Sequence, residues 1–202
     1  MAAHSRYDVS NEGAGISKNS ILINKLGIKE QTELDDAETL LLKDSYAHFL
    51  ELASQGKMAF DLPTLFSIHE YFLGTLYSWA GKVRGIDISK PGALFAPVAY
   101  MASSIKVLEK LIQTHLPKRK DSRKLIAEKI AVIHNELNVV HPFREGNGRT
   151  IRLFLDLIVA DLDLPPVDWN VKDYMSACQR GMSKDHSKMA KIIYHSISKK
   201  IG

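Results

Sequence analysis

Residues 141–152 read His-Pro-Phe-Arg-Glu-Gly-Asn-Gly-Arg-Thr-Ile-Arg and separate two segments whose apolar residues recur at helical spacing. His141 precedes a proline, and a residue in that position is pushed out of the α region, so the preceding helix is expected to end there. Two glycines flank the asparagine within 146–148 and permit a sharp turn. Arg149 and Arg152 follow at the beginning of the next helix, three residues apart and on one face. The stretch therefore predicts two helices joined by a tight turn that carries a histidine and two arginines.

This turn combines groups that suit a nucleoside triphosphate. The N–H groups at the start of a helix lack intrahelical partners, and together with the helix dipole they form an anion site. Arg149 and Arg152 can both reach a polyphosphate bound there. Glu145 supplies one carboxylate, which together with substrate phosphates is the usual way in which Mg²⁺ is held. His141 has the strength of a general base, because a free imidazole has a pKa of about 6.5.

These groups indicate a nucleotide-transfer site that awaits a hydroxyl nucleophile. The stretch is not a Walker loop, because no Gly-Lys-Ser/Thr sequence follows its glycines.

The chain on both sides of the turn predicts an all-α bundle. Asp35 or Asp36 is expected to cap the first helix and Asp61 the second, because a side-chain oxygen there satisfies an unpaired N–H group. The apolar stripe of the second helix extends to Trp79. Helices are expected at about residues 35–53, 61–79, 101–117, 122–140, 150–162, 171–180 and 183–199.

One segment departs from helical spacing. Apolar and polar residues alternate from Val83 to Ile88, and Lys90-Pro91-Gly92 is a strong turn signal. The segment predicts a short β-hairpin at about residues 86–95, inserted into the helical bundle.

Composition indicates one globular domain. The chain has 202 residues, of which 45% are hydrophobic and 25% charged, and its formal net charge is +4. The basic run at 118–120 has no interleaved aromatic residues, so direct nucleic-acid binding is not expected. No apolar run reaches the roughly 20 residues that span a bilayer, so no membrane segment is expected. We expect residues 1–34 to form a mobile leader and approach, and residues 35–202 to form the single catalytic domain.

The single cysteine, Cys178, excludes an internal disulfide and is expected to be a buried thiol. No signal peptide is evident at the N-terminus, and the expected location is the bacterial cytoplasm, with secretion as an effector left open.

Residues 141–152 match the motif HxFx(D/E)GNGRxxR of the Fic family at every specified position, and residues 79–90 resemble the hairpin flap that these proteins carry upstream. The resemblance covers roughly residues 62–193. It implies the Fic fold, an all-α bundle with a β-hairpin flap. It also implies a protein adenylyltransferase, which moves AMP from ATP to a Ser, Thr or Tyr hydroxyl of a target protein.

The resemblance implies a role for each motif residue. His141 deprotonates the target hydroxyl, Phe143 anchors the loop, and Glu145 coordinates the Mg²⁺ cofactor between the α- and β-phosphates. ATP is held by Gly146, Asn147 and Gly148 around its phosphates, by Arg149 at the β-phosphate and by Arg152 at the γ-phosphate. The flap docks the target by strand addition through Ile86, Asp87, Ile88, Ser89, Lys90 and Phe95. The adenine pocket is expected near the C-terminal helices, around Tyr174.

The sequence differs from other branches of the family in two respects, one that concerns the group transferred and one that concerns regulation. The Doc branch, which phosphorylates, carries a lysine-bearing version of the end of the motif, whereas Arg149 and Arg152 are intact here, which favours AMP transfer. The inhibitory helix (S/T)xxxE(G/N) is also missing, since no glutamate has Ser or Thr four residues before it. A separate antitoxin-like inhibitor protein is therefore expected to supply a glutamate to Arg152.

Two alternatives stay open. The chain could be a non-catalytic module that keeps the nucleotide site and uses the flap to recognise a partner. It could also be a Fic member that transfers a different phosphate-containing group.

Overall fold

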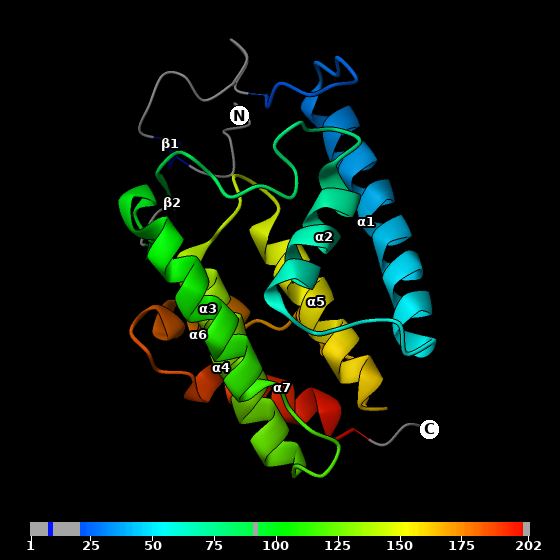
Figure 1. Ribbon diagram of the computed structural model, residues 1–202, viewed down its shortest axis with the longest axis vertical. Helices are drawn as coiled ribbons and strands as arrows, with labels where there is room; N and C mark the ends of the chain where they lie inside the picture. The colour runs from blue at the N-terminus through cyan, green and yellow to red at the C-terminus, as the bar shows by residue number, and fades with distance from the viewer. Residues whose placement is uncertain (1–7, 10–20, 91–92, 200–202) are drawn as a thin grey trace.

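The computed structural model describes residues 8–9, 21–90 and 93–199, and within these ranges it is an all-α bundle with one small β-sheet (Figure 1). The all-α expectation is therefore confirmed. The helices are α1 (Gln31–Ser54), α2 (Leu62–Leu73), α3 (Met101–His115), α4 (Arg123–Val140), α5 (Asn147–Asp161), α6 (Tyr174–Met182) and α7 (Ser187–Ile197). A 3-10 turn, η1 (Val98–Tyr100), precedes α3.

Side-chain caps open two of the helices, one of them at the expected Asp61. The Asp61 side chain accepts a hydrogen bond from the Thr64 N–H at 2.9 Å, at the beginning of α2. The Ser122 hydroxyl accepts one from the Leu125 N–H at 3.2 Å, at the beginning of α4. Each bond satisfies one of the N–H groups that a helix leaves unpaired at its first turn.

The predicted cap of the first helix is wrong, because α1 begins at Gln31, before Asp35 and Asp36. Asp35 instead lies just beyond the first turn and accepts a hydrogen bond from the Gln31 side chain at 2.9 Å. Leu34 is only 2% exposed. Its burial favours helix in the turn before the aspartates, and burial of an apolar side chain outweighs the modest contribution of a cap.

The second helix is shorter than its apolar stripe predicts, because α2 ends at Leu73 and Gly74 follows. A Cβ at position 74 would lie 2.4 Å from the Glu70 carbonyl oxygen, so the chain can turn there only without a side chain. Leu76 is still fully buried, although it lies in the turn beyond the helix, and Trp79 is half-buried.

Helix α4 lies at the centre of the bundle, where it contacts α3, α5, α6 and α7. Helices α1 and α2 pack on each other and on α5, and in Figure 1 α5 lies between this pair and the pair α3 and α4. The apolar faces of α4 and α5, including Ile130, Ile133 and Phe154, supply about half of the buried residues of the large core. The site motif therefore joins the two most central helices of the fold.

The expected hairpin is present as two antiparallel strands, β2 (Ile88–Lys90) and β3 (Ala93–Leu94), with Ser89 opposite Leu94. The predicted turn at positions 91–92 lies outside the described residues. A third strand, β1 (Asp8–Val9), pairs with the other edge of β2 and gives the order β1-β2-β3. The sheet therefore recruits a segment from the predicted leader. The predicted domain boundary at residue 35 stays a prediction.

Within the part of the chain that the structure describes, no helix is both long and apolar enough to cross a membrane.

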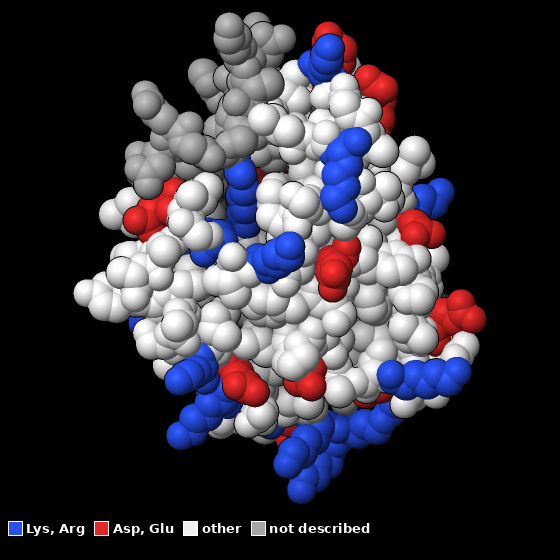
Figure 2. All heavy atoms as spheres, turned by 45° about the horizontal axis from the view of Figure 1, so that its top comes forward, with Lys and Arg blue, Asp and Glu red and all other residues white. Residues whose placement is uncertain are grey.

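The surface carries charges of both signs. Figure 2 shows lysine and arginine side chains interspersed with acidic ones over one face, with the densest basic group along its lower edge. This distribution agrees with the small formal charge of +4.

Candidate functional site

The turn between α4 and α5 is shaped by two left-handed residues. His141 ends α4 with φ 48° and ψ 66°, and Gly146 precedes α5 with φ 78°. A Cβ at position 146 would lie 2.7 Å from the Leu73 side chain, so only glycine fits. The Thr150 N–H donates to the Gly146 carbonyl at 3.0 Å, and the amides of 147–149 therefore precede the first bond of this helical turn. Amides in this position are the groups that the predicted anion site needs.

Hydrogen bonds between the Asn147 side chain and the Phe143 backbone hold the loop together. The Asn147 Oδ1 accepts from the Phe143 N–H at 2.9 Å, and its Nδ2 donates to the Phe143 carbonyl at 2.6 Å. Both side chains are fully buried. Phe143 thus packs inward as expected. Both polar atoms of the Asn147 side chain bond to Phe143, so only its backbone amide is left for the phosphate contact that the sequence predicts.

His141 is a buried, neutral imidazole. It is 3% exposed, and its ring stacks on Phe95 with centroids 3.8 Å apart. The Asn138 carbonyl lies 2.6 Å from Nδ1 and can only accept, so Nδ1 carries the proton and Nε2 is the basic nitrogen. Burial lowers the pKa of His141 to about 3, because desolvation disfavours the charged form. The side chain is therefore in the state that a general base requires.

A second buried histidine, His69 on α2, packs against the loop and forms a hydrogen bond with it. The Gly81 N–H donates to its Nδ1 at 2.8 Å, so its Nε2 carries the proton and donates to the Glu145 carbonyl at 2.9 Å. Its ring stacks on Phe143 with centroids 3.7 Å apart. Burial lowers the pKa of His69 to about 4, and the neutral form is the one that makes both bonds.

The first arginine of the motif is held by carboxylates. Arg149 Nη1 donates to Glu38 of α1 at 2.6 Å, and Nη2 lies 3.6 Å from Glu145. The Tyr77 hydroxyl donates to the other oxygen of Glu38 at 2.7 Å. The Glu145 Oε1 also accepts from the Gly146 N–H at 2.9 Å. These contacts fix α1 to the loop and hold Glu145 beside the beginning of α5.

The second arginine, Arg152, lies one turn into α5 and packs against α6. Its Nη1 donates to the Tyr174 hydroxyl at 3.3 Å, and its guanidinium lies 5.7 Å from the centre of the Tyr174 ring. A Cβ at Gly148 would be 3.2 Å from the same nitrogen, so the glycine leaves room for the guanidinium. His134 of α4 bonds to the Tyr174 hydroxyl at 3.0 Å from behind.

His141, Gly148 and Arg152 face one hollow of about 290 Å³ between the flap, α4, α5 and α6. Lys90 of the flap and Tyr174 line it as well, and so does Cys178, which is a free buried thiol as expected. Glu145 and Arg149 do not line this hollow. The structure thus brings the base and the second arginine together and places the first arginine behind the loop.

The flap residues differ in whether their side chains are buried beneath the sheet or exposed. Ile88 and Phe95 are buried, and they pack with Ile86 and Met182 beneath the sheet. Asp87 accepts a hydrogen bond from the Val98 N–H at 2.7 Å and joins the flap to η1. Ser89 and Lys90 are partly exposed.

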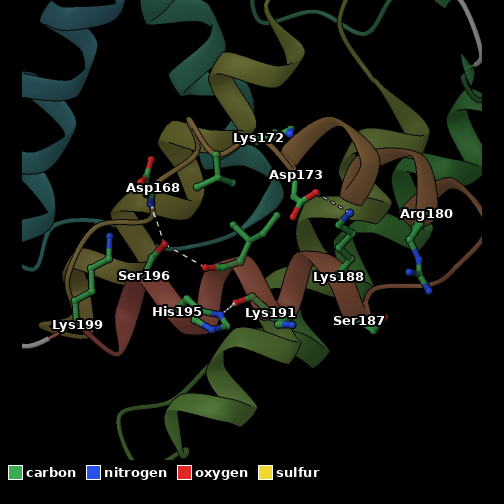
Figure 3. A pocket seen from close by; sticks show the side chains of 12 residues that line it. Asp168, Lys172, Asp173, Arg180, Ser187, Lys188, Lys191, His195, Ser196 and Lys199 are labelled. Atoms are coloured by element: carbon green, nitrogen blue, oxygen red, sulfur yellow. Dashed lines mark hydrogen bonds and ion pairs between the residues drawn. The ribbon is translucent and has the colours of Figure 1, made fainter.

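A larger hollow lies elsewhere, along α7 and the beginning of α6, with a volume of about 610 Å³. Figure 3 shows its basic side chains along the groove from Lys199 to Arg180, with Lys188 directed at Asp173, to which it bonds at 3.0 Å. Arg180 is paired with Asp185. This groove contains no residue of the motif.

The model of the Fic/DOC family matches residues 59–159, a range that contains α2, the flap, α4 and the whole motif. The chain belongs to this family.

Two relatives show how far the similarity extends. The protein adenylyltransferase VbhT of Bartonella schoenbuchensis is 31% identical over 169 residues, which are 82% of this chain and 34% of VbhT. The chain thus spans about a third of that relative. The Sinorhizobium fredii protein named "Probable protein adenylyltransferase y4lH" is 30% identical over 92% of this chain and 95% of its own length.

Solved Fic structures share the fold. The BepC effector of Bartonella tribocorum, crystallised with bound AMPPNP, superposes with a TM-score of 0.75 at 23% identity, covering 92% of this chain and 96% of that one. The N-terminal Fic domain of Bep8 from Bartonella sp. 1-1C gives a TM-score of 0.74 at 20% identity, covering 93% and 94%.

Three residues that hold the Fic motif in place escaped the sequence reasoning: Glu38, His69 and Arg84. Each is buried and polar, and each lies far from the motif in sequence. The only available signal was an ionisable residue within a predicted buried segment, and such a signal is weak because many helices carry one by chance. Arg84 falls inside the segment compared with the flap, but nothing in that segment assigns it a role.

Proposed function

We propose that this Fic protein is a protein adenylyltransferase that transfers AMP from ATP to a hydroxyl side chain of a target protein. One observation carries the proposal: the neutral, hydrogen-bonded imidazole of His141 and the guanidinium of Arg152 face the same hollow at the beginning of α5. A base beside an anion site is what activation of a hydroxyl toward a phosphate requires. The names of VbhT and y4lH support this assignment.

ATP would bind with its phosphates against the amides of 147–149 and the guanidinium of Arg152. The Arg149 Nη2 finds no hydrogen-bond acceptor among the described residues, whereas Nη1 is engaged by Glu38. This nitrogen is the donor left for a β-phosphate oxygen, which it would reach only if the Arg149 side chain turned from behind the loop when ATP binds. The adenine would extend toward Tyr174, in the direction of α6.

The residues fit a Mg²⁺ cofactor that is shared with the substrate. Among the described residues no cluster of three or more His, Cys, Asp or Glu side chains could enclose a metal by itself. Glu145 offers a single hard carboxylate beside the anion site, and Mg²⁺ commonly takes one or two carboxylates together with substrate phosphates. When bound, the ion would neutralise charge on the phosphates.

The chemical step follows from the tautomer of His141. Nε2 accepts the proton of the target hydroxyl while that oxygen attacks the α-phosphorus. The bond from the α-phosphorus to the bridging oxygen of the β-phosphate breaks, and pyrophosphate leaves with the electron pair. The backbone amides at the start of α5 stabilise the charge that develops on the phosphates.

The target would dock on the flap. The central strand β2 pairs with β1 on one side and with β3 on the other, so a target segment would add to an edge strand such as β3 and not to β2. An extended target segment that adds to β3 would gain main-chain hydrogen bonds without regard to its side chains.

A separate inhibitor protein would regulate this site. Within the described residues no carboxylate forms an ion pair with Arg152, whose hydrogen bond goes to the Tyr174 hydroxyl. We propose that an antitoxin-like partner inserts a glutamate there and excludes the γ-phosphate. Co-expression with the product of the neighbouring gene should abolish labelling, whereas inactivity of the isolated chain would contradict this regulation.

Labelled ATP tests the activity. ATP labelled on the α-phosphate should label a second protein in a lysate, whereas ATP labelled on the γ-phosphate should not. Transfer of the γ-label would favour a different phosphate-containing group. Binding of ATP with no transfer of either label would favour the non-catalytic module.

A further inference from the structure

We propose that Arg84 is a positioning residue that couples the flap to His141 and so sets the distance between a docked target hydroxyl and the base. The inference rests on the proposed adenylyl transfer, and it concerns a residue outside the motif. Arg84 lies between α2 and the flap, and its side chain is completely buried.

Arg84 binds both legs of the flap. Its Nη1 donates to the Ile86 carbonyl at 2.7 Å, before β2, and its Nη2 donates to the Ala96 carbonyl at 2.5 Å, after β3. The guanidinium therefore fixes the separation of the two strands at their base. Because β2 and β3 contain only three and two residues, few ladder bonds would fix that separation without it.

The same guanidinium binds the end of α4. Nε donates to the His141 carbonyl at 2.8 Å, and Nη2 also donates to the Val140 carbonyl at 3.2 Å. In addition, the Arg84 backbone N–H donates to the Pro142 carbonyl at 2.8 Å. Arg84 thus holds three successive carbonyls around the left-handed residue that carries the imidazole.

Charge explains why an arginine is needed. The carboxylate of Asp87 lies 3.9 Å away and is 58% exposed, so it compensates the buried cation only weakly. The carbonyls at the C-terminus of α4 carry the negative end of the helix dipole and compensate it better. A planar guanidinium presents five donors in a fixed fork, whereas a lysine ammonium cannot reach acceptors that lie in these separate directions.

Two further contacts connect the end of the flap to α4 and to the imidazole of His141. The Ala96 N–H donates to the Val139 carbonyl at 3.1 Å, and the Phe95 ring stacks on the imidazole of His141. The leg of the flap that Arg84 holds therefore also supports the ring of the base. A change at Arg84 should move the flap relative to His141 while leaving the anion site, which is held by Asn147 and His69, in place.

The substitution Arg84→Lys tests this coupling with three measurements on the full chain. We expect transfer to target protein at saturating ATP to fall by about 10²-fold, which is the cost of a misplacement near 1 Å. The affinity for ATP should stay within about threefold, because no phosphate-binding group changes. Hydrogen exchange at the Leu94 and Ala96 amides should become at least about tenfold faster.

Leu108→Ala is the matched control, since Leu108 is a buried apolar residue in the middle of α3, outside both the flap and the motif in the sequence. It should lower stability without changing exchange in the flap selectively. Transfer within about threefold of wild type in Arg84→Lys, or loss of ATP affinity in parallel with transfer, would overturn the inference.

The exchange measurement separates this inference from the proposed function. Unchanged flap exchange in Arg84→Lys would refute the coupling even where wild type transfers AMP. A wild-type chain that binds ATP and transfers nothing would refute the proposed function, and the positioning role with it.

Discussion

The hollow at the α4–α5 turn and the groove along α7 differ in how their polar groups are held. The groove is the larger, about 610 Å³ against about 290 Å³, and its charges lie on exposed side chains such as Arg180. In the smaller hollow the imidazole of His141 is 3% exposed, stacked and hydrogen-bonded. Exposed charges are screened by water, whereas desolvated groups that are fixed before the substrate arrives act at full strength. The size of a hollow is therefore a poor guide to chemistry here.

Removal of the imidazole of His141 should give the largest effect on the rate of AMP transfer. A small effect would contradict the assignment of the chemistry to the smaller hollow. We expect His141→Ala to lower the rate of AMP transfer by about 10²–10⁴-fold, because the target hydroxyl loses its proton acceptor. ATP affinity should persist, since His141 contributes no phosphate donor. Rates of label transfer and binding of a fluorescent ATP analogue would measure the two quantities. Full transfer by this variant would refute the mechanism.

We expect acid to lower the free energy of unfolding, because three histidines near the motif are buried in their neutral form. Burial lowers the pKa of His69 and His134 to about 4 and that of His141 to about 3, against about 6.5 in an unfolded chain. Between pH 6.5 and about 4 the unfolded state therefore binds more protons, so stability is fully present above pH 6.5 and falls as the pH drops. The buried Asp156, whose pKa is raised to about 6, offsets part of this loss.

Urea unfolding at pH 7 and pH 5 would measure this effect, and we expect the free energy of unfolding to fall by a few kcal/mol. His69→Gln removes one of the three buried groups and should reduce the pH dependence by about a third. A free energy of unfolding that is equal at the two pH values would contradict the buried neutral state of these histidines.

Loss of the second arginine should weaken nucleotide binding. Arg152→Ala removes the charged donor that we propose for the γ-phosphate, so we expect ATP to bind about 1.5–3 kcal/mol less tightly, which corresponds to about 10–150-fold in Kd. AMP should be affected much less, because it lacks the β- and γ-phosphates. Isothermal titration with both nucleotides would measure the difference, and equal losses for ATP and AMP would argue against this placement.

Changes in the groove should have the smallest effect. Lys191→Ala and Lys199→Ala remove exposed charges on and just beyond α7. We expect the free energy of unfolding to change by less than about 0.5 kcal/mol and the rate of AMP transfer to stay within about twofold. Urea unfolding and label transfer would measure both. A large loss of transfer would show that the groove takes part in the chemistry and would remove the distinction between the two hollows.

The sequence determined those parts of the protein that depend on residues close together in the chain. The tight turn, the left-handed Gly146, the position of His141 at the end of α4 and the arginines on α5 all lie within residues 141–152. The apolar periodicities likewise predicted seven helices and one hairpin. Where the pattern failed, at the beginning of α1 and the end of α2, local capping and spacing rules gave way to the burial of Leu34 and the tight turn at Gly74.

The tertiary structure alone decided what surrounds the motif. Glu38 and His69 approach the loop from helices that are distant in the chain, and Arg84 clamps the flap to the end of α4. Their partners are mostly backbone carbonyls and one guanidinium, which leave no pattern in the sequence. The direction of Arg149, toward Glu38 and away from the hollow of His141, has the same origin. Spacing along a helix fixes which residues share a face, but only the packing of other helices decides what that face meets.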